Sequence, residues 1–135
     1  MTAEKQNAAR SIVAAYCDAW MAGDVLAALG FYHGDLALTW PGRNQLAGVH
    51  EGQAAAVDAL LRLQELTNRQ PLELVDIHQG QDSVMVVVVE RWTDPGNPSR
   101  SVDLRRALEF TIEDDKLRTC QVYETDQHVV DEWIG

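Results

Sequence analysis

The C-terminal half of the chain decides the fold, and from Ser83 to Asp126 it reads SVMVVVVERWTDPGNPSRSVDLRRALEFTIEDDKLRTCQVYETD. Turn-forming residues at 94–98 (DPGNP) and 114–116 (DDK) divide this stretch. The runs that they separate are rich in β-branched, aromatic or alternating apolar residues: Ser83–Trp92, Ser101–Ile112 and Leu117–Thr125. This pattern predicts a long antiparallel meander.

The first half of the chain predicts helices that cover this sheet. An apolar stripe at three- and four-residue spacing indicates a helix over about residues 3–22, which Gly23 ends. A short helix follows over about 25–32, and another runs from about 51 or 52 to 66. Between them Leu36–Trp40 predicts a short strand, followed by a loop to Gly48, and Leu72–His78 predicts a strand before the meander. The tail after Asp126 indicates a short helix or a flap over a sheet edge.

This order of elements indicates an α+β fold in one domain over residues 1–135. Residues 84–89 are apolar on both strand faces, so helices must cover one face and something else the other. We predict a cone-shaped α+β barrel in which three N-terminal helices pack on a strongly curved mixed or antiparallel sheet. A pocket between the sheet and the helices is the expected functional site.

The net charge of −10 and the pI near 4.6 exclude the usual nucleic-acid-binding proteins, because the chain has no basic stripe to offset repulsion by phosphates. Neither a signal peptide nor a membrane-spanning stretch is recognisable, so we expect a cytoplasmic protein without membrane contact. Cys17 and Cys120 lack metal-ligand spacing, which predicts buried free thiols.

The apolar residues on the other sheet face predict a partner. Val84, Val86 and Val88, with Leu104 and Leu108 beside them, form more apolar surface than one set of helices covers. A homodimer formed through the sheet faces is the expected solution.

Several segments resemble the nuclear transport factor two-like superfamily, which includes ketosteroid isomerases, SnoaL-like polyketide cyclases and limonene epoxide hydrolases. The segments that carry the resemblance are Tyr16–Asp24, Phe31–Asp35, Gly48 and Gly52 before the third helix, Val88–Arg91 and Val122–Asp126. The resemblance covers nearly the whole chain. It implies the cystatin-like cone, a small-molecule pocket and no organic cofactor or metal.

The residues of the superfamily's known sites match only in part. The resemblance places Tyr16 where ketosteroid isomerases have the tyrosine that donates to the developing oxyanion, but Trp40 replaces their general-base aspartate. It places Arg91 where limonene epoxide hydrolases have an arginine between two aspartates, which Thr93 and Tyr123 replace here. Tyr123 also replaces the last-strand aspartate of the SnoaL-like cyclases. Each of these mechanisms therefore lacks its acid.

The remaining polar residues form the expected site. We expect Tyr16, Arg91 and Tyr123 as catalytic residues. Trp20, Trp40, Thr93 and His50 are expected to contact the substrate. This set requires that Val87, Val89, Arg91 and Thr93 face the pocket, as strand alternation allows.

Each of these residues also has a structural interpretation. Arg91 could instead form an ion pair with Asp126, Tyr16 could be a core tyrosine, and Arg105 could reach the pocket if a bulge shifts the strand register. His50 is the one histidine placed to act as a general base, and the sequence predicts no metal site.

The leading hypothesis is an enzyme of the SnoaL-like type that acts on an apolar oxygenated ligand, such as a polyketide, terpenoid or steroid-like compound. Cyclisation, isomerisation or dehydration suits a site without a carboxylate base, because catalysis then relies on positioning and electrostatic stabilisation. The alternatives are a non-catalytic ligand-binding protein with the same pocket and a structural module with a filled cone.

Overall fold

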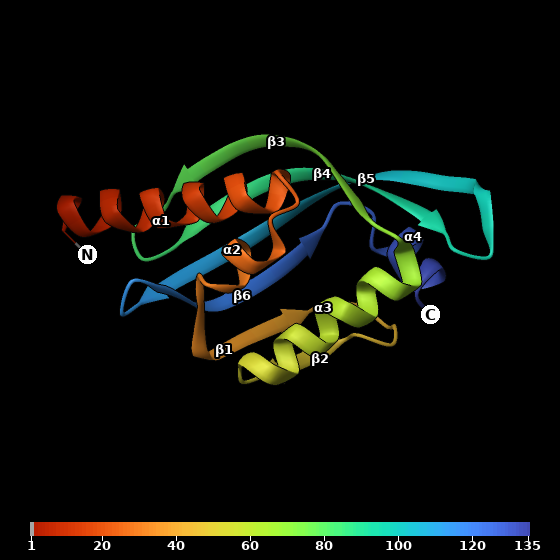
Figure 1. Cartoon of the computed structure of the whole chain (residues 1–135), viewed down its shortest axis with the longest axis horizontal. Coiled ribbons are helices and arrows are strands. Elements are labelled where there is room, and N and C mark those ends of the chain that lie inside the picture. The colour runs from red at the N-terminus through yellow and green to blue at the C-terminus, as the bar shows by residue number, and fades with distance from the viewer. Residues whose placement is uncertain (1) are drawn as a thin grey trace.

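The computed structural model describes residues 2–135, which form helices first and mostly strands afterwards (Figure 1). The helices are α1 (Ala3–Met21), α2 (Val25–Leu29), α3 (Gln53–Thr67) and α4 (Gln127–Trp133). The strands are β1 (Tyr32–Trp40), β2 (Gly48–Glu51), β3 (Gln70–Gln79), β4 (Val84–Asp94), β5 (Asn97–Glu113) and β6 (Lys116–Glu124). The predicted α+β class is confirmed, and the predicted elements follow one another as expected, with the strand β2 added before α3.

The strands form one mixed sheet in the order β2-β1-β6-β5-β4-β3. Only β1 and β6 are parallel, and every other neighbouring pair is antiparallel. β2 and β3 are the free edges, so the sheet curves without closing. The meander β4-β5-β6 supplies the centre of the sheet, as the sequence predicted.

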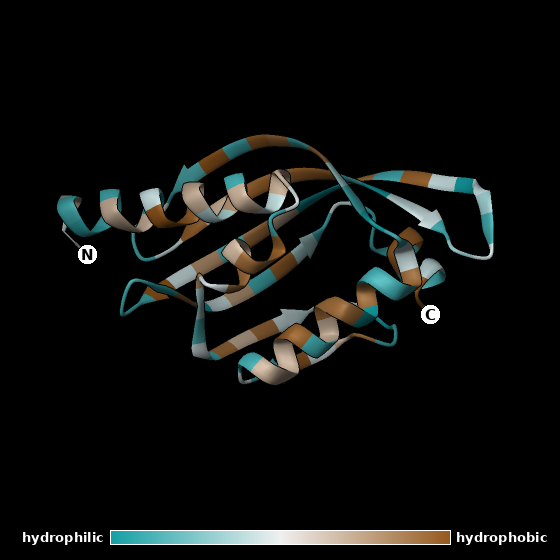
Figure 2. Cartoon of the chain, in the orientation of Figure 1, coloured by the Kyte–Doolittle hydropathy of each residue, from teal (hydrophilic) through white to brown (hydrophobic). Residues whose placement is uncertain are grey.

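The helices lie over one face of this sheet and enclose the core (Figure 1). α1 packs against β3 and α3 against β1 and β2, and α2 lies between them. The buried apolar side chains form one cluster, to which Val13 of α1, Leu63 of α3 and Phe110 of β5 contribute. In Figure 2 apolar and polar segments alternate along β5 and β6, which is the pattern of strands with one buried face.

The central strand β4 turns the face opposite to the predicted one toward this core. Val84, Val86, Val88 and Trp92 are almost fully buried, whereas Arg91 is exposed. The expectation that Val87, Val89, Arg91 and Thr93 face inward is therefore wrong. The physical reason is that residues 84–89 are apolar on both faces, so their own pattern does not distinguish the two orientations.

The ends of several elements also differ from the prediction. β2 falls in the segment predicted as a loop and in the first residue of the predicted third helix, and it pairs antiparallel with the end of β1. α2 is shorter than expected and β1 longer, because Gly30 ends the helix and the strand begins at Tyr32.

The C-terminal tail is a helix that covers one end of the sheet. Val130 and Ile134 are buried, and the Trp133 ring lies 6.5 Å from that of Trp92. Asp131 Oδ1 accepts hydrogen bonds from Asn44 Nδ2 at 2.8 Å and from the Arg43 backbone N–H at 3.0 Å. These contacts fasten α4 to the loop after β1. No helix between residues 2 and 135 is long and apolar enough to cross a membrane.

Candidate functional site

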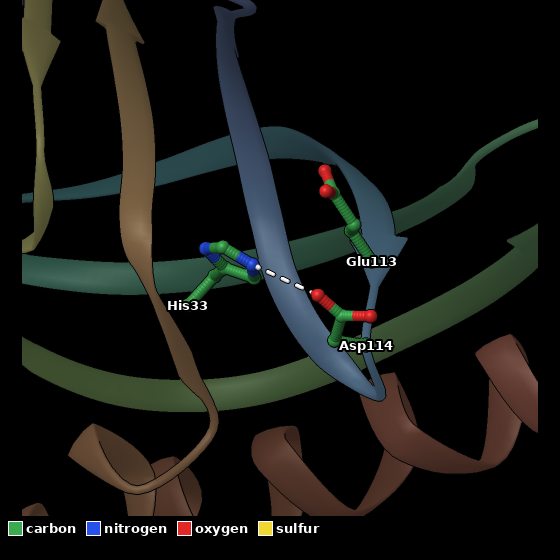
Figure 3. A group of neighbouring side chains, drawn as sticks. All are labelled: His33, Glu113 and Asp114. Atoms are coloured by element: carbon green, nitrogen blue, oxygen red, sulfur yellow. Dashed lines mark ion pairs between the residues drawn. The ribbon is translucent and has the colours of Figure 1, made fainter.

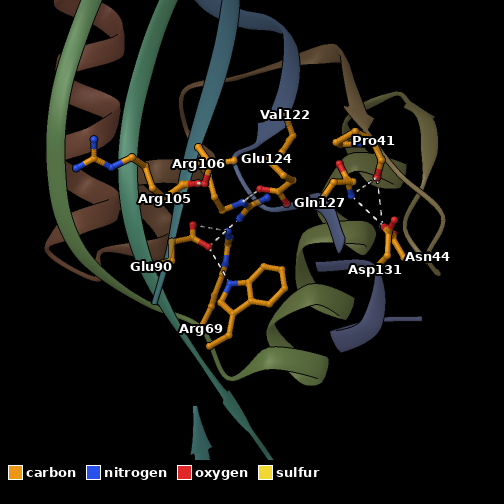
Figure 4. Close-up of polar contacts among 12 residues, drawn as sticks. Pro41, Asn44, Arg69, Glu90, Arg105, Arg106, Val122, Glu124, Gln127 and Asp131 are labelled. Carbon is orange, nitrogen blue, oxygen red and sulfur yellow. Dashed lines mark hydrogen bonds and ion pairs between the residues drawn. The ribbon is translucent and has the colours of Figure 1, made fainter. Parts of the chain in front are cut away.

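A cluster of charged side chains lies inside the cone, where an ordinary core would be apolar (Figure 4). Arg106 of β5 donates from Nη1 to Glu90 Oε1 of β4 at 2.7 Å, and from Nε to Glu124 Oε1 of β6 at 2.6 Å. Arg69, directly before β3, donates to Glu90 Oε2 at 3.3 Å. Arg106 and Glu90 are 1% and 0% exposed. Because burying charge is costly, such a cluster marks a candidate functional site.

The pKa values of the two carboxyl groups in this cluster are shifted in opposite directions. Burial disfavours the charge on Glu90, yet Arg106 and Arg69 outweigh it and lower the pKa of this carboxyl. Burial raises the pKa of Glu124, and the attraction of Arg106 only partly offsets this. Glu90 is thus the firmly ionised partner of Arg106.

Two buried N–H donors beside this cluster have no acceptor among residues 2–135. Glu90 and Glu124 bind Nε and Nη1 of Arg106, which leaves Nη2 without a partner. The indole Nε1 of Trp40 also lacks one. The guanidinium carbon of Arg106 lies 4.6 Å from the centre of the Trp40 ring, so the two side chains are neighbours. Unsatisfied buried donors are rare, which makes this pair a candidate contact for a ligand acceptor.

Arg106 and Trp40 line a small inner chamber. The centre of a water molecule can occupy about 40 Å³ of it. Tyr16 and Tyr32 line it too, and their hydroxyls are hydrogen-bonded at 2.9 Å. Because one hydroxyl donates and the other accepts, one phenol proton is left without an acceptor in the described chain. Cys120 also lines the chamber, but burial raises the pKa of its thiol to about 12, so it stays protonated.

A larger space, which we call the vestibule, lies between the end of α1, α2 and α3. It has about 510 Å³ open to water centres and mostly apolar walls, including Val25, Leu29, Val57 and Leu61. This volume lies within the range of about 300–1,000 Å³ that is usual for small-molecule sites. The vestibule therefore has room for a ligand body, whereas the inner chamber holds only a small group.

Three of the predicted site residues line the inner chamber. Tyr16 and Trp20 reach it from α1, and Trp40 from the end of β1. Burial raises the pKa of Tyr16 well above its ordinary value, so this phenol is a neutral hydrogen-bonding group.

The other four predicted residues lie away from the chamber. Arg91 forms an ion pair of 2.7 Å with Asp103 on the outer sheet face, where Tyr123, 45% exposed, donates to Glu109. Thr93 is opposite Ser101 at the far end of β4, and His50 hydrogen-bonds the Leu46 carbonyl at 2.7 Å. The expectation that Arg91 and Tyr123 converge with Tyr16 is wrong, because both occupy the outward positions of their strands.

Sequence reasoning missed the charged residues that do line the core. Arg106 lies in step with Leu104, Leu108 and Phe110 of β5, and this alternation indicates the buried face of the strand. Arg105, its neighbour, points the other way (Figure 4). Strand alternation places Glu90 and Glu124 on the same sheet face as Arg106, because Glu90 is opposite Leu104 and Glu124 is opposite Arg106. The sequence therefore did contain a signal for this cluster.

A second group of ligand-type side chains lies at the far end of β5. His33, Glu113 and Asp114 bring possible ligand atoms within 4.8 Å of one another (Figure 3). His33 Nδ1 accepts from the Asp35 N–H at 2.9 Å, and Nε2 lies 3.5 Å from Asp114. Arg118 pairs with Glu113 at 3.2 Å. Ordinary hydrogen bonds and ion pairs account for this group.

Comparison with protein families identifies a SnoaL-like domain over residues 13–119. The chain belongs to the SnoaL-like family. No curated protein matches the sequence significantly.

Solved structures of the same fold cover nearly the whole SnoaL-like chain. A Xanthomonas campestris protein of unknown function with a cystatin-like fold has a TM-score of 0.82 at 22% identity, covering 93% of this chain and 96% of its own. A candidate polyketide cyclase from Xanthomonas campestris pv. campestris has a TM-score of 0.70 at 25% identity, covering 96% of each chain. TerC, co-crystallised with polyporic acid, has a TM-score of 0.76 at 17% identity, covering 92% and 95%. These matches confirm the predicted cystatin-like, nuclear transport factor two-like fold.

Proposed function

We propose that this SnoaL-like protein is an enzyme that binds an apolar, oxygenated small molecule and stabilises negative charge on one of its oxygens. Polyketides, terpenoids and steroid-like compounds are the candidate ligands, and cyclisation, isomerisation or dehydration the candidate reactions. The candidate polyketide cyclase and the TerC complex with polyporic acid support an oxygenated organic ligand.

One observation carries the proposal: Arg106 Nη2 and Trp40 Nε1, on neighbouring side chains, are buried donors without an acceptor among residues 2–135. Two carboxylates hold the guanidinium in place, so the Arg106 donor needs no reorganisation when charge develops on a ligand oxygen. Fixed donors in a site without bulk water stabilise an enolate-like oxyanion more than the neutral carbonyl. The phenol pair of Tyr16 and Tyr32 adds one more proton to the same chamber.

A binding protein without catalysis is the second candidate. The observation that favours it is the absence of any Asp, Glu or His from the chamber lining in the described chain. A reaction that starts by removing a proton therefore needs water or the ligand itself as the base. An enzyme lowers the barrier to that step and a binding protein does not.

Hydrogen–deuterium exchange separates the two candidates. We expect 2-tetralone, an apolar bicyclic ketone, to exchange its α-protons in D₂O faster when bound than when free, as followed by NMR. Trp40→Phe removes one unpartnered donor and should slow the bound exchange by about 10²–10³-fold, the usual cost of losing one oxyanion donor. Trp133→Phe, in α4, is the matched control and should keep the wild-type rate. Binding without faster exchange would support the binding protein.

A further inference from the structure

The vestibule and the inner chamber share one wall. Trp20, Tyr32, Leu60 and Arg69 line both spaces, so these side chains form a neck between them. The inner chamber is far smaller than the vestibule and admits only a small group. A ligand that uses both spaces must therefore have a small head and a larger body.

Two large apolar side chains that line the vestibule are exposed to solvent. Val25 of α2 is 63% exposed and Leu61 of α3 is 57% exposed, and both line this space. An apolar ligand body would cover these surfaces, and removing them from water favours binding.

The charge along this path is of one sign. Arg69 is the one charged residue among the described residues that line the vestibule, and the inner chamber adds only Arg106. The chain as a whole carries −10, so this positive lining is a local feature. Both arginines donate hydrogen bonds to Glu90, and Arg69 does so through Nη1 alone. The Arg69 guanidinium carbon lies 5.7 Å from the centre of the Trp20 ring, and the side chain is 16% exposed, so it remains accessible from the vestibule.

We propose that the ligand is an amphiphilic monoanion. Its carboxylate lies in the neck against Arg69, its reacting oxygen enters the inner chamber beside Arg106, and its hydrocarbon body lies in the vestibule. This inference names the ligand class for the same site and so rests on the proposed function. A guanidinium is the side chain best suited to a carboxylate because its N–H groups match both oxygens.

Three ligands with the same chain and different heads test the charge requirement: sodium decanoate, 1-decanol and decyltrimethylammonium bromide. Tryptophan fluorescence should report binding because Trp20 lies in the neck. We expect decanoate to bind at least about tenfold more tightly than the other two, in line with a charge-assisted hydrogen bond. Octanoate should bind more weakly than decanoate by about fourfold for each methylene removed, if the vestibule holds the chain.

Two pairs of variants place the head and the body. Arg69→Gln should remove the preference for decanoate over decanol, and Arg62→Gln, on α3 outside both spaces and paired with Glu65, should keep it. Because Arg69 also supports Glu90, the exposed Leu61 gives a second test that leaves the core unchanged. Leu61→Glu should weaken decanoate and strengthen decyltrimethylammonium, whereas Leu61→Gln should keep the wild-type order.

Equal affinities for decanoate and decanol, or no response to Leu61→Glu, would overturn the inference. The proposed function fails separately, through unchanged exchange of bound 2-tetralone. Faster exchange without a preference for decanoate therefore rejects the anionic ligand alone, and a preference for decanoate without faster exchange rejects the enzyme alone.

Discussion

Arg106 is held by two carboxylates on neighbouring strands, and its removal leaves both of them buried without their main cation. A buried charge that loses its partner costs about 3–5 kcal/mol. We therefore expect Arg106→Met to lower the free energy of unfolding by this amount, as measured by urea denaturation. Arg105→Met is the matched control, because the adjacent side chain is exposed, and it should leave the midpoint nearly unchanged. A similar loss in both variants would contradict the placement of the charge cluster.

Glu124 predicts an unusual pH dependence, because burial raises its pKa above the ordinary 4.5. Above that pH the folded state keeps the proton that the unfolded state releases, so this group makes stability fall as the pH rises. The stability of wild type relative to Glu124→Gln should therefore decrease as the pH rises from 4.5 through the raised pKa of Glu124, as urea unfolding can measure. The contribution of Glu90 to the pH dependence of stability has the opposite sign, since its lowered pKa makes stability fall as the pH drops below 4.5. A relative stability that increases with pH would show that Glu124 is ionised like Glu90.

The residues of the site could be predicted from the sequence only where an element has one apolar stripe. The helical spacing of α1 places Tyr16 and Trp20 inward, and the alternation of β1 does the same for Trp40. In β4 both faces are apolar, so the choice between Glu90 and Arg91 had no local basis. The resemblance to epoxide hydrolases then selected Arg91. In the folded chain Arg91 pairs with Asp103 on the outer sheet face, and Glu90 pairs with Arg106 on the inner face.

At the scale of elements, helices and long strands were predictable because each has its own periodicity and its own turn signals. β2 has four residues, too few for a recognisable pattern, and it forms because the end of β1 offers a free edge. The loop between these strands carries the contacts that dock α4, and Gly42 lies at its closest approach.

Gly42 has φ +93, and a methyl group there would collide with the side chains of Gln127 and Asp131 in α4. Gly48, with φ +115 and open space around it, is the matched control. We expect Gly48→Ala to cost about 1–2 kcal/mol, the penalty of a left-handed conformation for a residue with a side chain. Gly42→Ala should cost more, because the Gln127 and Asp131 side chains must also move, which disturbs the hydrogen bonds that Asp131 accepts from Arg43 and Asn44. Thermal unfolding of both variants measures the difference, and equal costs would show that α4 docks without this close approach.

The outer sheet face is where the sequence predicted a homodimer interface. The sequence predicted that Val84, Val86 and Val88 form an apolar outer face, but these valines are buried under the helices. The outer face instead carries Val87, Ala107 and Tyr123 in one cross-strand row, with ion pairs such as Arg91–Asp103 beside it. The reason given for a homodimer was therefore wrong in detail, and the partly exposed row is the remaining basis for it.

We propose that a second copy covers this row, since a mixed apolar and polar sheet face suits an interface between like subunits. Light scattering should then give about twice the chain mass of 15.0 kDa. Ala107→Arg places a long cation at the centre of the row and should yield monomers, because two such cations would meet across a two-fold axis. Leu26→Arg, at an 84% exposed position on α2, adds the same charge outside the sheet and should remain dimeric. A wild-type protein that stays monomeric at every concentration tested would leave the outer face without a partner of its own kind.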